Sequence, residues 1–297
     1  MDTLESLRTK IDGAKDLKSV VKTMKAVAAS NIGQYESAVA SLGDYYRTIA
    51  LGIIAYLRAE KIETINSKPV LKTNTEDLTG VVVFGSDQGL VGPFNDSLTA
   101  FVNTSLKDIP GKKEIWAVGE RIPLLLADVG FAPAKLFSVP GTVNAVTPLV
   151  GEIIITAQEN LDKGELKAVY IFHNQPKPGA GYLPVMQRLL PLDEKWRSTI
   201  TELKWPNNKI PQVAGGLQPT LSALIREYLF VSLFKACTES LASENASRLN
   251  SMQRAEKNIG DLLDDLNKNY HRLRQSSIDE ELFDVVSGFE ALKNGTN

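Results

Sequence analysis

The chain has 297 residues, of which 43% are hydrophobic and 23% are charged, and its formal net charge is −2. This length suffices for a large core or for two units, and the near-neutral charge gives no indication of nucleic-acid binding. The single cysteine, Cys237, excludes an intrachain disulfide and a cysteine-cluster zinc site, and no apolar run is long enough to predict a membrane span.

The N-terminal segment, residues 1–60, contains no proline, and apolar or small residues recur in it at steps of three or four. This spacing keeps one narrow stripe on one side of a helix, as in the seam of a coiled coil. Four glycines, Gly13, Gly33, Gly43 and Gly52, each weaken an isolated helix by about 1 kcal/mol relative to alanine. We therefore expect a long helix over 1–60 that is stabilised by a partner helix. The stripe consists of Leu4, Leu7, Ile11, Ala14, Leu17, Val21, Met24, Ala28, Ile32, Tyr35, Val39, Leu42, Tyr46, Ile49, Ile53 and Tyr56.

The middle of the chain contains all 14 prolines, from Pro69 to Pro219. Residues 60–77 are polar and are predicted to be a linker, and residues 195–218 are predicted to return the chain as a strand or loop. Between them, strand and helix patterns alternate, which predicts a Rossmann-like α/β domain over 78–205 with a mostly parallel sheet. Strands are predicted at Gly80–Gly85, Glu114–Val118, Lys135–Val139, Leu166–His173 and Tyr182–Leu192, and helices at Asn95–Leu106, Arg121–Asp128 and Val146–Leu161.

The C-terminal segment, residues 219–292, has no proline after Pro219 and again shows apolar residues at three- and four-residue steps. A helix of that length would extend roughly 100 Å at 1.5 Å per residue. Since the two terminal segments flank one domain, we expect them to pair as a long antiparallel coiled coil.

A glycine-rich turn, Gly85–Gly92, follows the first predicted strand, where α/β folds bind phosphates. Its glycine spacing matches neither the dinucleotide fingerprint nor the phosphate loop of nucleotide triphosphatases. A tight structural turn is the favoured interpretation, and a small-molecule enzyme that uses Gly85–Asn95 is the weaker alternative.

Isolated polar residues give little indication of catalysis. His173 is expected in a surface loop, with an active-site base as the alternative, and Cys237 is expected to be a small core residue. The acidic residues Asp261, Asp264 and Asp265 are expected on a solvated helix face. No metal or cofactor is predicted.

Basic residues recur on one face of the N-terminal helix, at Lys15, Lys18, Lys22 and Lys25. They indicate either an ordinary solvated face or a positive surface that meets acidic loops of another protein. Composition leaves both open.

Three ordered motifs resemble the gamma subunit of F-type ATP synthases and together cover nearly the whole chain. The first is Leu7-Arg8-x-x-Ile11 with the stretch from Val21 to Ser30. The second is the turn from Ser86 to Asn95. The third comprises Ser243–Met252, Tyr270–Leu282 and Val285–Gly288.

The resemblance implies a non-catalytic central rotor, in which the paired terminal helices lie inside a ring of alternating alpha and beta subunits. It also implies that the α/β domain contacts the epsilon subunit and the membrane c-ring, and that rotation couples ion translocation to ATP synthesis or hydrolysis. The implied location is the cytoplasmic face of a prokaryotic inner membrane, as a peripheral protein.

Five residues correspond to the family's contacts with beta subunits: Met24, Glu244, Arg248, Arg274 and Gln275. An arginine suits such contacts because its planar guanidinium can donate two hydrogen bonds to a carboxylate. We expect the four polar residues on the outward face of the C-terminal helix, and we expect alanine at Arg248 or Arg274 to weaken coupling while the fold survives.

The turn departs from the family pattern at Gln88, Val91 and Pro93, and Asn31–Tyr35 replaces a usually basic segment. These differences resemble a divergent, alternative prokaryotic branch of the family. The interpretation from another class is a coiled-coil scaffold or tether with an α/β binding head.

Overall fold

The computed structural model describes residues 3–59, 78–162, 166–177, 181–192, 205 and 216–294. The chain divides into two compact units, one made of Met1–Val27 with Leu249–Asn297 and the other of Ala28–Arg248. Two terminal helices, α1 (Leu4–Ala59) and α6 (Leu217–Asn294), contribute to both units. Among the described helices, none combines the length and apolar character that a membrane crossing requires.

In the first unit, α1 and α6 pair through a small apolar core. Ile11, Ala14 and Leu263 are buried together, and Lys25 Nζ donates a hydrogen bond to Glu256 in the same unit. The residue number of the contacting residue on α6 falls as the residue number on α1 rises, so the helices run antiparallel. Ile259, Leu266 and Tyr270 pack against this core as partly buried residues.

In the second unit the same pairing continues with larger side chains. Ile49 and Ile53 of α1 are buried against Tyr228 and Val231 of α6. Gly52 belongs to this contact, because a Cβ atom there would lie 2.8 Å from Leu224 Cδ2. The close approach of the helices offsets the low helix propensity of this glycine. The predicted antiparallel pairing is confirmed, and the predicted seam is confirmed except at Leu17, which is 60% exposed.

The second unit also contains a five-stranded sheet with the order β3-β2-β1-β4-β5. All neighbouring strands are parallel except β4 and β5, which are antiparallel. The mostly parallel sheet is therefore confirmed, with β5 as the antiparallel edge. The strands are β1 (Leu78–Phe84), β2 (Lys112–Val118), β3 (Pro133–Phe137), β4 (Leu166–Lys177) and β5 (Gly181–Leu190).

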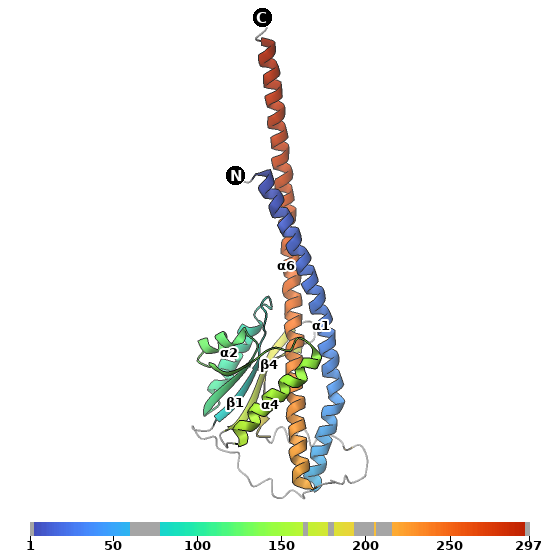
Figure 1. The fold of residues 1–297 in the computed structure, drawn as a ribbon, viewed down its shortest axis with the longest axis vertical. Helices are drawn as coiled ribbons and strands as arrows, with labels where there is room; N and C mark the ends of the chain where they lie inside the picture. The colour runs from blue at the N-terminus through green and yellow to red at the C-terminus, as the bar shows by residue number, and fades with distance from the viewer. Residues whose placement is uncertain are drawn as a thin grey trace. The chain divides into compact units, whose positions relative to one another are not determined.

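Helices cover both faces of this sheet (Figure 1). The helices α2 (Phe94–Lys107) and α3 (Ile122–Asp128) bury one face, on which Val81 and Val83 of β1 lie. The helix α4 (Val146–Asp162), which follows the short helix η2 (Val143–Ala145), packs on the opposite face together with α6. Alternate residues of β1 therefore face different layers, as the period of two along a strand requires.

The placement of His173 differs from the sequence-based expectation. The strand β4 continues past it to Lys177 because β5 pairs with this extension, and His173 lies opposite Val185. Its side chain is buried at 3% exposure. The predicted surface-loop position is wrong.

The predicted linker at 60–77 lies outside the described residues, as does most of the predicted return segment at 195–218. Of that return segment, Trp205 is described and packs against Ala50 and Ile54 of α1. The division into 1–60, 78–205 and 219–292 remains a prediction.

Candidate functional site

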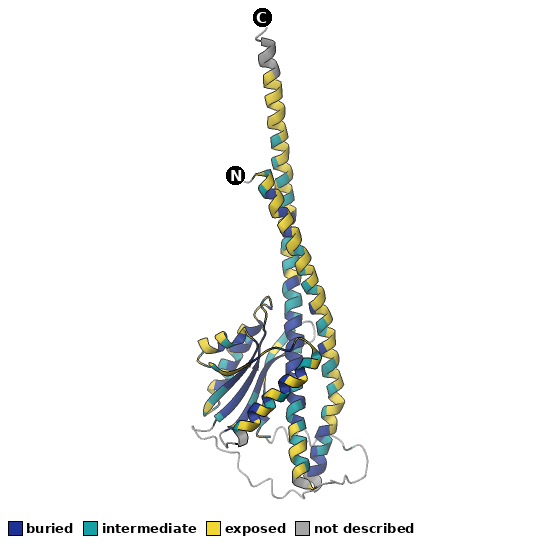
Figure 2. Ribbon diagram, viewed as in Figure 1, coloured by how far each residue is buried: buried dark blue, intermediate teal, exposed yellow. Residues whose placement is uncertain are grey.

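Two of the five predicted site residues meet on α6. Arg248 Nη2 donates a hydrogen bond to Glu244 Oε1 at 2.6 Å, one helical turn away. The side chains are only 12% and 7% exposed, so the expected outward position is wrong for this pair. In this stretch of α6, Ser243 and Ser247 donate hydrogen bonds to carbonyls of the α/β domain, and Figure 2 shows that α6 is largely buried beside the sheet.

Burial and neighbouring charges shape the electrostatics of this pair. Burial raises the pKa of Glu244, the Arg248 guanidinium opposes this rise, and the charge of Asp87 adds to it. Asp87 belongs to the turn after β1 and its Oδ1 accepts a hydrogen bond from the Glu120 amide at 3.0 Å. Without Arg248, a charged Glu244 carboxylate would therefore destabilise the folded state.

The turn between β1 and α2 is tight and internally hydrogen-bonded, which confirms the favoured interpretation of Gly85–Gly92. The Ser86 amide donates to Asn95 Oδ1 at 3.1 Å, and Asn95 Nδ2 donates to Ser86 Oγ at 2.9 Å. Leu90 and Gly92 have φ values of 62° and 57°, and glycine adopts this left-handed region without strain. Ser247 Oγ of α6 donates to the Val91 carbonyl at 2.6 Å. The turn thus attaches to α6.

The other three predicted site residues lie in the first unit. Met24 is half-buried, next to the Lys25–Glu256 ion pair, and Arg274 and Gln275 are exposed. Glu256 precedes Arg274 by roughly 27 Å of helix at 1.5 Å per residue. Met24 and the Arg274–Gln275 pair therefore occupy separate places on this unit.

Basic residues of α1 make contacts inside the first unit. Lys25 lies 2.5 Å from Glu256 Oε2. The hydrogen bond from Lys25 lowers the pKa of Glu256, and the charges of Lys25, Lys18 and Lys22 lower it further. Part of this basic face is thus neutralised by α6, an outcome that neither open interpretation included.

The remaining polar candidates have structural environments. Asp261, Asp264 and Asp265 are exposed on α6, as expected. Cys237 is buried, and burial followed by the charge of Glu244 raises the pKa of its thiol above the usual range. The core interpretation of Cys237 is confirmed. Within the described residues, no group of three or more His, Cys, Asp or Glu could hold a metal ion.

Sequence reasoning missed the contacts between α6 and the ends of the strands. Glu239 meets His173, and Ser240, Ser243 and Ser247 donate hydrogen bonds to backbone carbonyls of the α/β domain. The available signal was the spacing of these four α6 residues, which places polar side chains on one face of an otherwise apolar stretch. Polar side chains on such a face are buried only where the segment packed against them supplies hydrogen-bonding groups.

A family model described as ATP synthase matches residues 3–292. The ATP synthase gamma chain of Histophilus somni (strain 2336) is 28% identical over 296 residues, which cover 97% of this chain and 99% of that one. The ATP synthase gamma chain of Pasteurella multocida (strain Pm70) is 29% identical with the same coverage.

Solved structures share the fold. A chain in the Euglena gracilis mitochondrial ATP synthase (OSCP/F1/c-ring, rotational state 3) has a TM-score of 0.62 at 17% identity, covering 99% of this chain and 96% of that one. A chain in the Tetrahymena thermophila mitochondrial ATP synthase (central stalk/c-ring) has a TM-score of 0.57 at 19% identity, covering 80% and 99%.

The paired terminal helices and the mostly parallel α/β sheet define the same fold class as these solved structures. The chain belongs to the ATP synthase gamma-chain family. As a member it is a non-catalytic subunit of an ATP synthase.

Proposed function

We propose that the chain transmits torque between a membrane c-ring and a catalytic ring of alpha and beta subunits. In this role the paired helices α1 and α6 turn inside the ring, and the α/β domain contacts the epsilon subunit and the c-ring. The observation that carries the proposal is the family match over residues 3–292, to which both helices and the α/β domain contribute. The proposed location is peripheral, on the cytoplasmic face of a prokaryotic inner membrane.

The proposed beta-subunit contacts fall into two groups. Arg274 and Gln275 are exposed on α6, and an exposed arginine is available for a bidentate bond to a partner carboxylate. Met24 is partly accessible and would add an apolar contact. Glu244 and Arg248 are already paired with each other, so in this proposal they act by maintaining the surface next to Asp87.

The arrangement of the chain fits this role. We propose that residues 1–60 and 219–292 form the coupling helices and that 78–205 form the domain that the c-ring drives. A helix pair transmits torque only if it resists sliding, and the buried cores Ile11–Leu263 and Ile53–Tyr228 supply that resistance in the two units.

Reconstitution tests the proposal. Alpha and beta subunits are purified with and without this chain, and assembly is measured by size exclusion and ATPase activity by phosphate release. The expected result is a stable complex with altered ATPase activity only when the chain is present. Assembly and activity that are indifferent to the chain would refute the proposal.

A further inference from the structure

The sheet of this chain has the topology that creates a ligand crevice in other α/β proteins. The connections β1-α2-β2-α3-β3 proceed to one side of β1, and β4 then returns to its other side. The strand order therefore reverses between β1 and β4. In open α/β sheets, ligands bind at this position outside the carboxyl ends of the strands.

In this chain, side chains of α6 occupy that crevice. Ser240 Oγ donates to the carbonyl of Phe84, the last residue of β1, at 3.1 Å. Ser243 Oγ donates to the Asn174 carbonyl of β4 at 2.9 Å. The two serines thus bond to both strands that flank the reversal point.

A third contact adds charge. Glu239 Oε2 lies 2.8 Å from His173 Nε2 of β4, and Glu239 Oε1 accepts a hydrogen bond from Gln175 Nε2 at 3.3 Å. Lys235 Nζ lies 3.7 Å from Glu239 Oε1. We call the Ser240–Phe84, Ser243–Asn174 and Glu239–His173 interactions the crevice contacts.

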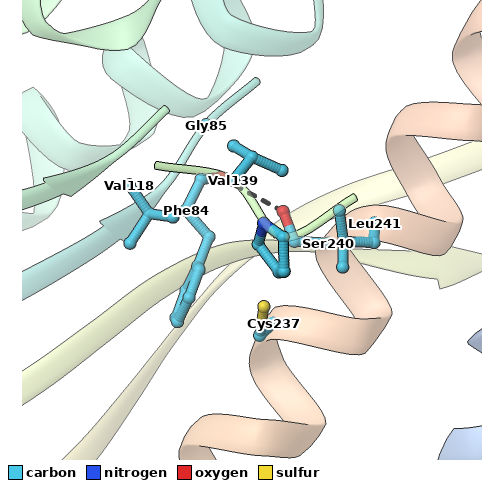
Figure 3. A pocket seen from close by; sticks show the side chains of 8 residues that line it. Phe84, Gly85, Val118, Val139, Cys237, Ser240 and Leu241 are labelled. Carbon is cyan, nitrogen blue, oxygen red and sulfur yellow. Dashed lines mark hydrogen bonds between the residues drawn. The ribbon is translucent and has the colours of Figure 1, made fainter. Parts of the chain in front are cut away.

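The hollow between α6 and the end of β1 is small. Figure 3 shows the hollow beside the Ser240–Phe84 hydrogen bond, which Gly85, Val118, Val139, Pro140, Cys237 and Leu241 also line. Its volume of about 10 Å³ is at the lower limit for a single water molecule. The position that holds a ligand in related topologies is therefore filled by the chain's own helix.

We propose that Glu239, Ser240 and Ser243 are positioning residues that hold the sheet on α6 against twisting, so that torque applied to the α/β domain reaches α6. This proposal rests on the proposed rotor function. Apolar packing alone resists separation of two surfaces but is non-directional. Hydrogen bonds depend on angle, so three of them spread over two strands also oppose rotation of the sheet about the helix.

Burial makes these contacts effective. His173, Asn174, Ser240 and Ser243 are each at most 3% exposed, and Glu239 is 7% exposed. A buried hydrogen bond that breaks leaves groups without water to replace the lost partner. Twisting the sheet on α6 would break the crevice contacts together, since they lie on one face of the helix.

Hydrogen exchange on the full chain tests the contacts without any partner. The variant is Ser240→Ala with Ser243→Ala, and the control is Thr220→Ala, which removes an exposed hydroxyl of the same helix that bonds Gly216. We expect amide protection over residues 84–95 and 170–177 to fall about tenfold in the double variant and to stay unchanged in the control. Equal protection in both would overturn the proposal.

The proposed role in transmitting torque is tested with a quantity that does not depend on the amount of folded protein. Ions translocated per ATP hydrolysed are measured in vesicles that contain purified, assembled complexes. We expect this ratio to fall at least twofold with His173→Leu and with the double serine variant. We expect recovery with His173→Gln, because a glutamine amide can still donate to Glu239, and no change with Thr220→Ala.

The outcomes separate the two proposals. A wild-type ratio in the His173→Leu and double serine complexes would overturn the role of the crevice contacts while the rotor function stands. A wild-type chain that neither assembles with alpha and beta subunits nor supports coupled translocation would overturn the proposed function, and the mechanical role with it.

Discussion

Glu244 and Arg248 form an ion pair of 2.6 Å on α6 in which both side chains are largely shielded from water. Removing one member of such a pair destabilises the fold more than replacing both members with apolar residues, because one charge stays buried without a partner. The pair therefore contributes to stability in addition to any role in coupling.

Arg248→Ala is predicted to lower the free energy of unfolding of the full chain by about 3–5 kcal/mol. The lower end applies because burial already raises the pKa of Glu244, which can then take up a proton. This revises the expectation that the fold tolerates alanine at Arg248. Urea unfolding measures the change, and Arg226→Ala, an exposed arginine of the same helix, is the control, predicted to change stability by about 0.5 kcal/mol or less. Equal effects of the two substitutions would contradict the prediction.

Much of the fold was predictable because its patterns are long and consistent. The terminal helices follow from a sustained seam and the proline distribution, and the sheet follows from alternating strand and helix segments. The predicted strand at Leu166–His173 was too short, since its extension to Lys177 depends on pairing with β5. Pairing between strands is a tertiary event that local composition does not encode.

The site was predictable in a different way. A resemblance supplied the identity of Glu244 and Arg248, but an i,i+4 pair on a helix has the same pattern whether it faces water or a sheet. The same limit applies to Ser240 and Ser243, which are indistinguishable in the sequence from solvated helix residues. Their burial depends on where the strands end, and only the assembled sheet determines that.

Leu263 and Leu262 are adjacent in sequence and differ in burial, at 9% and 51% exposure. Leu263→Ala is predicted to destabilise the helix pair of the first unit by about 2–4 kcal/mol, because it removes packing against Ile11 and Ala14. Leu262→Ala is the matched control, with a predicted change of about 0.5 kcal/mol or less. Thermal unfolding followed by circular dichroism, with hydrogen exchange over residues 4–27, measures both. A Leu262 effect as large as that of Leu263 would show that the seam is misassigned.

Gly85 and Gly89 belong to the same turn and differ in available space. A Cβ atom at Gly85 would lie 2.6 Å from Ile122 Cβ, whereas at Gly89 the nearest atom is Arg121 Nη2 at 3.9 Å. Gly85→Ala is predicted to cost about 1–3 kcal/mol through overpacking. Gly89→Ala is predicted to be neutral within about 0.5 kcal/mol. Urea unfolding of the two variants in parallel tests the close approach of α3 to the turn, and equal stabilities would argue against it.

The protonation of Glu239 makes the free energy of unfolding depend on pH in the acidic range. Burial would raise its pKa, but the hydrogen bond and charge of His173, with Lys235 and Gln175, outweigh burial and lower the pKa below its usual value. A lowered pKa means that the unfolded state binds the proton more readily. The stabilisation is therefore fully present above the unfolded pKa and is lost as pH falls through the folded pKa.

The Glu239→Gln variant is predicted to lose less stability than the wild type when the pH is lowered through that window. Glu280→Gln, an exposed carboxyl on the same helix, should retain the wild-type slope. Urea midpoints measured from pH 6 downward give the comparison. Parallel slopes for wild type and Glu239→Gln would contradict the assignment.

Arg274 offers the most direct separation of coupling from folding. Its side chain is exposed, and within the described residues it has no recorded ion pair, so Arg274→Ala should change the free energy of unfolding by only about 0.5 kcal/mol. If Arg274 donates two hydrogen bonds to a beta-subunit carboxylate, the same substitution should lower ATP-driven ion translocation per assembled complex several-fold.

Two further variants serve as controls for Arg274→Ala. Arg274→Lys keeps the charge without the planar guanidinium and should recover only part of the coupling. Arg272→Ala, also exposed on α6, is the control for charge loss at this level of the helix. Undiminished translocation by Arg274→Ala complexes, or an equal loss with Arg272→Ala, would remove Arg274 from the proposed contact.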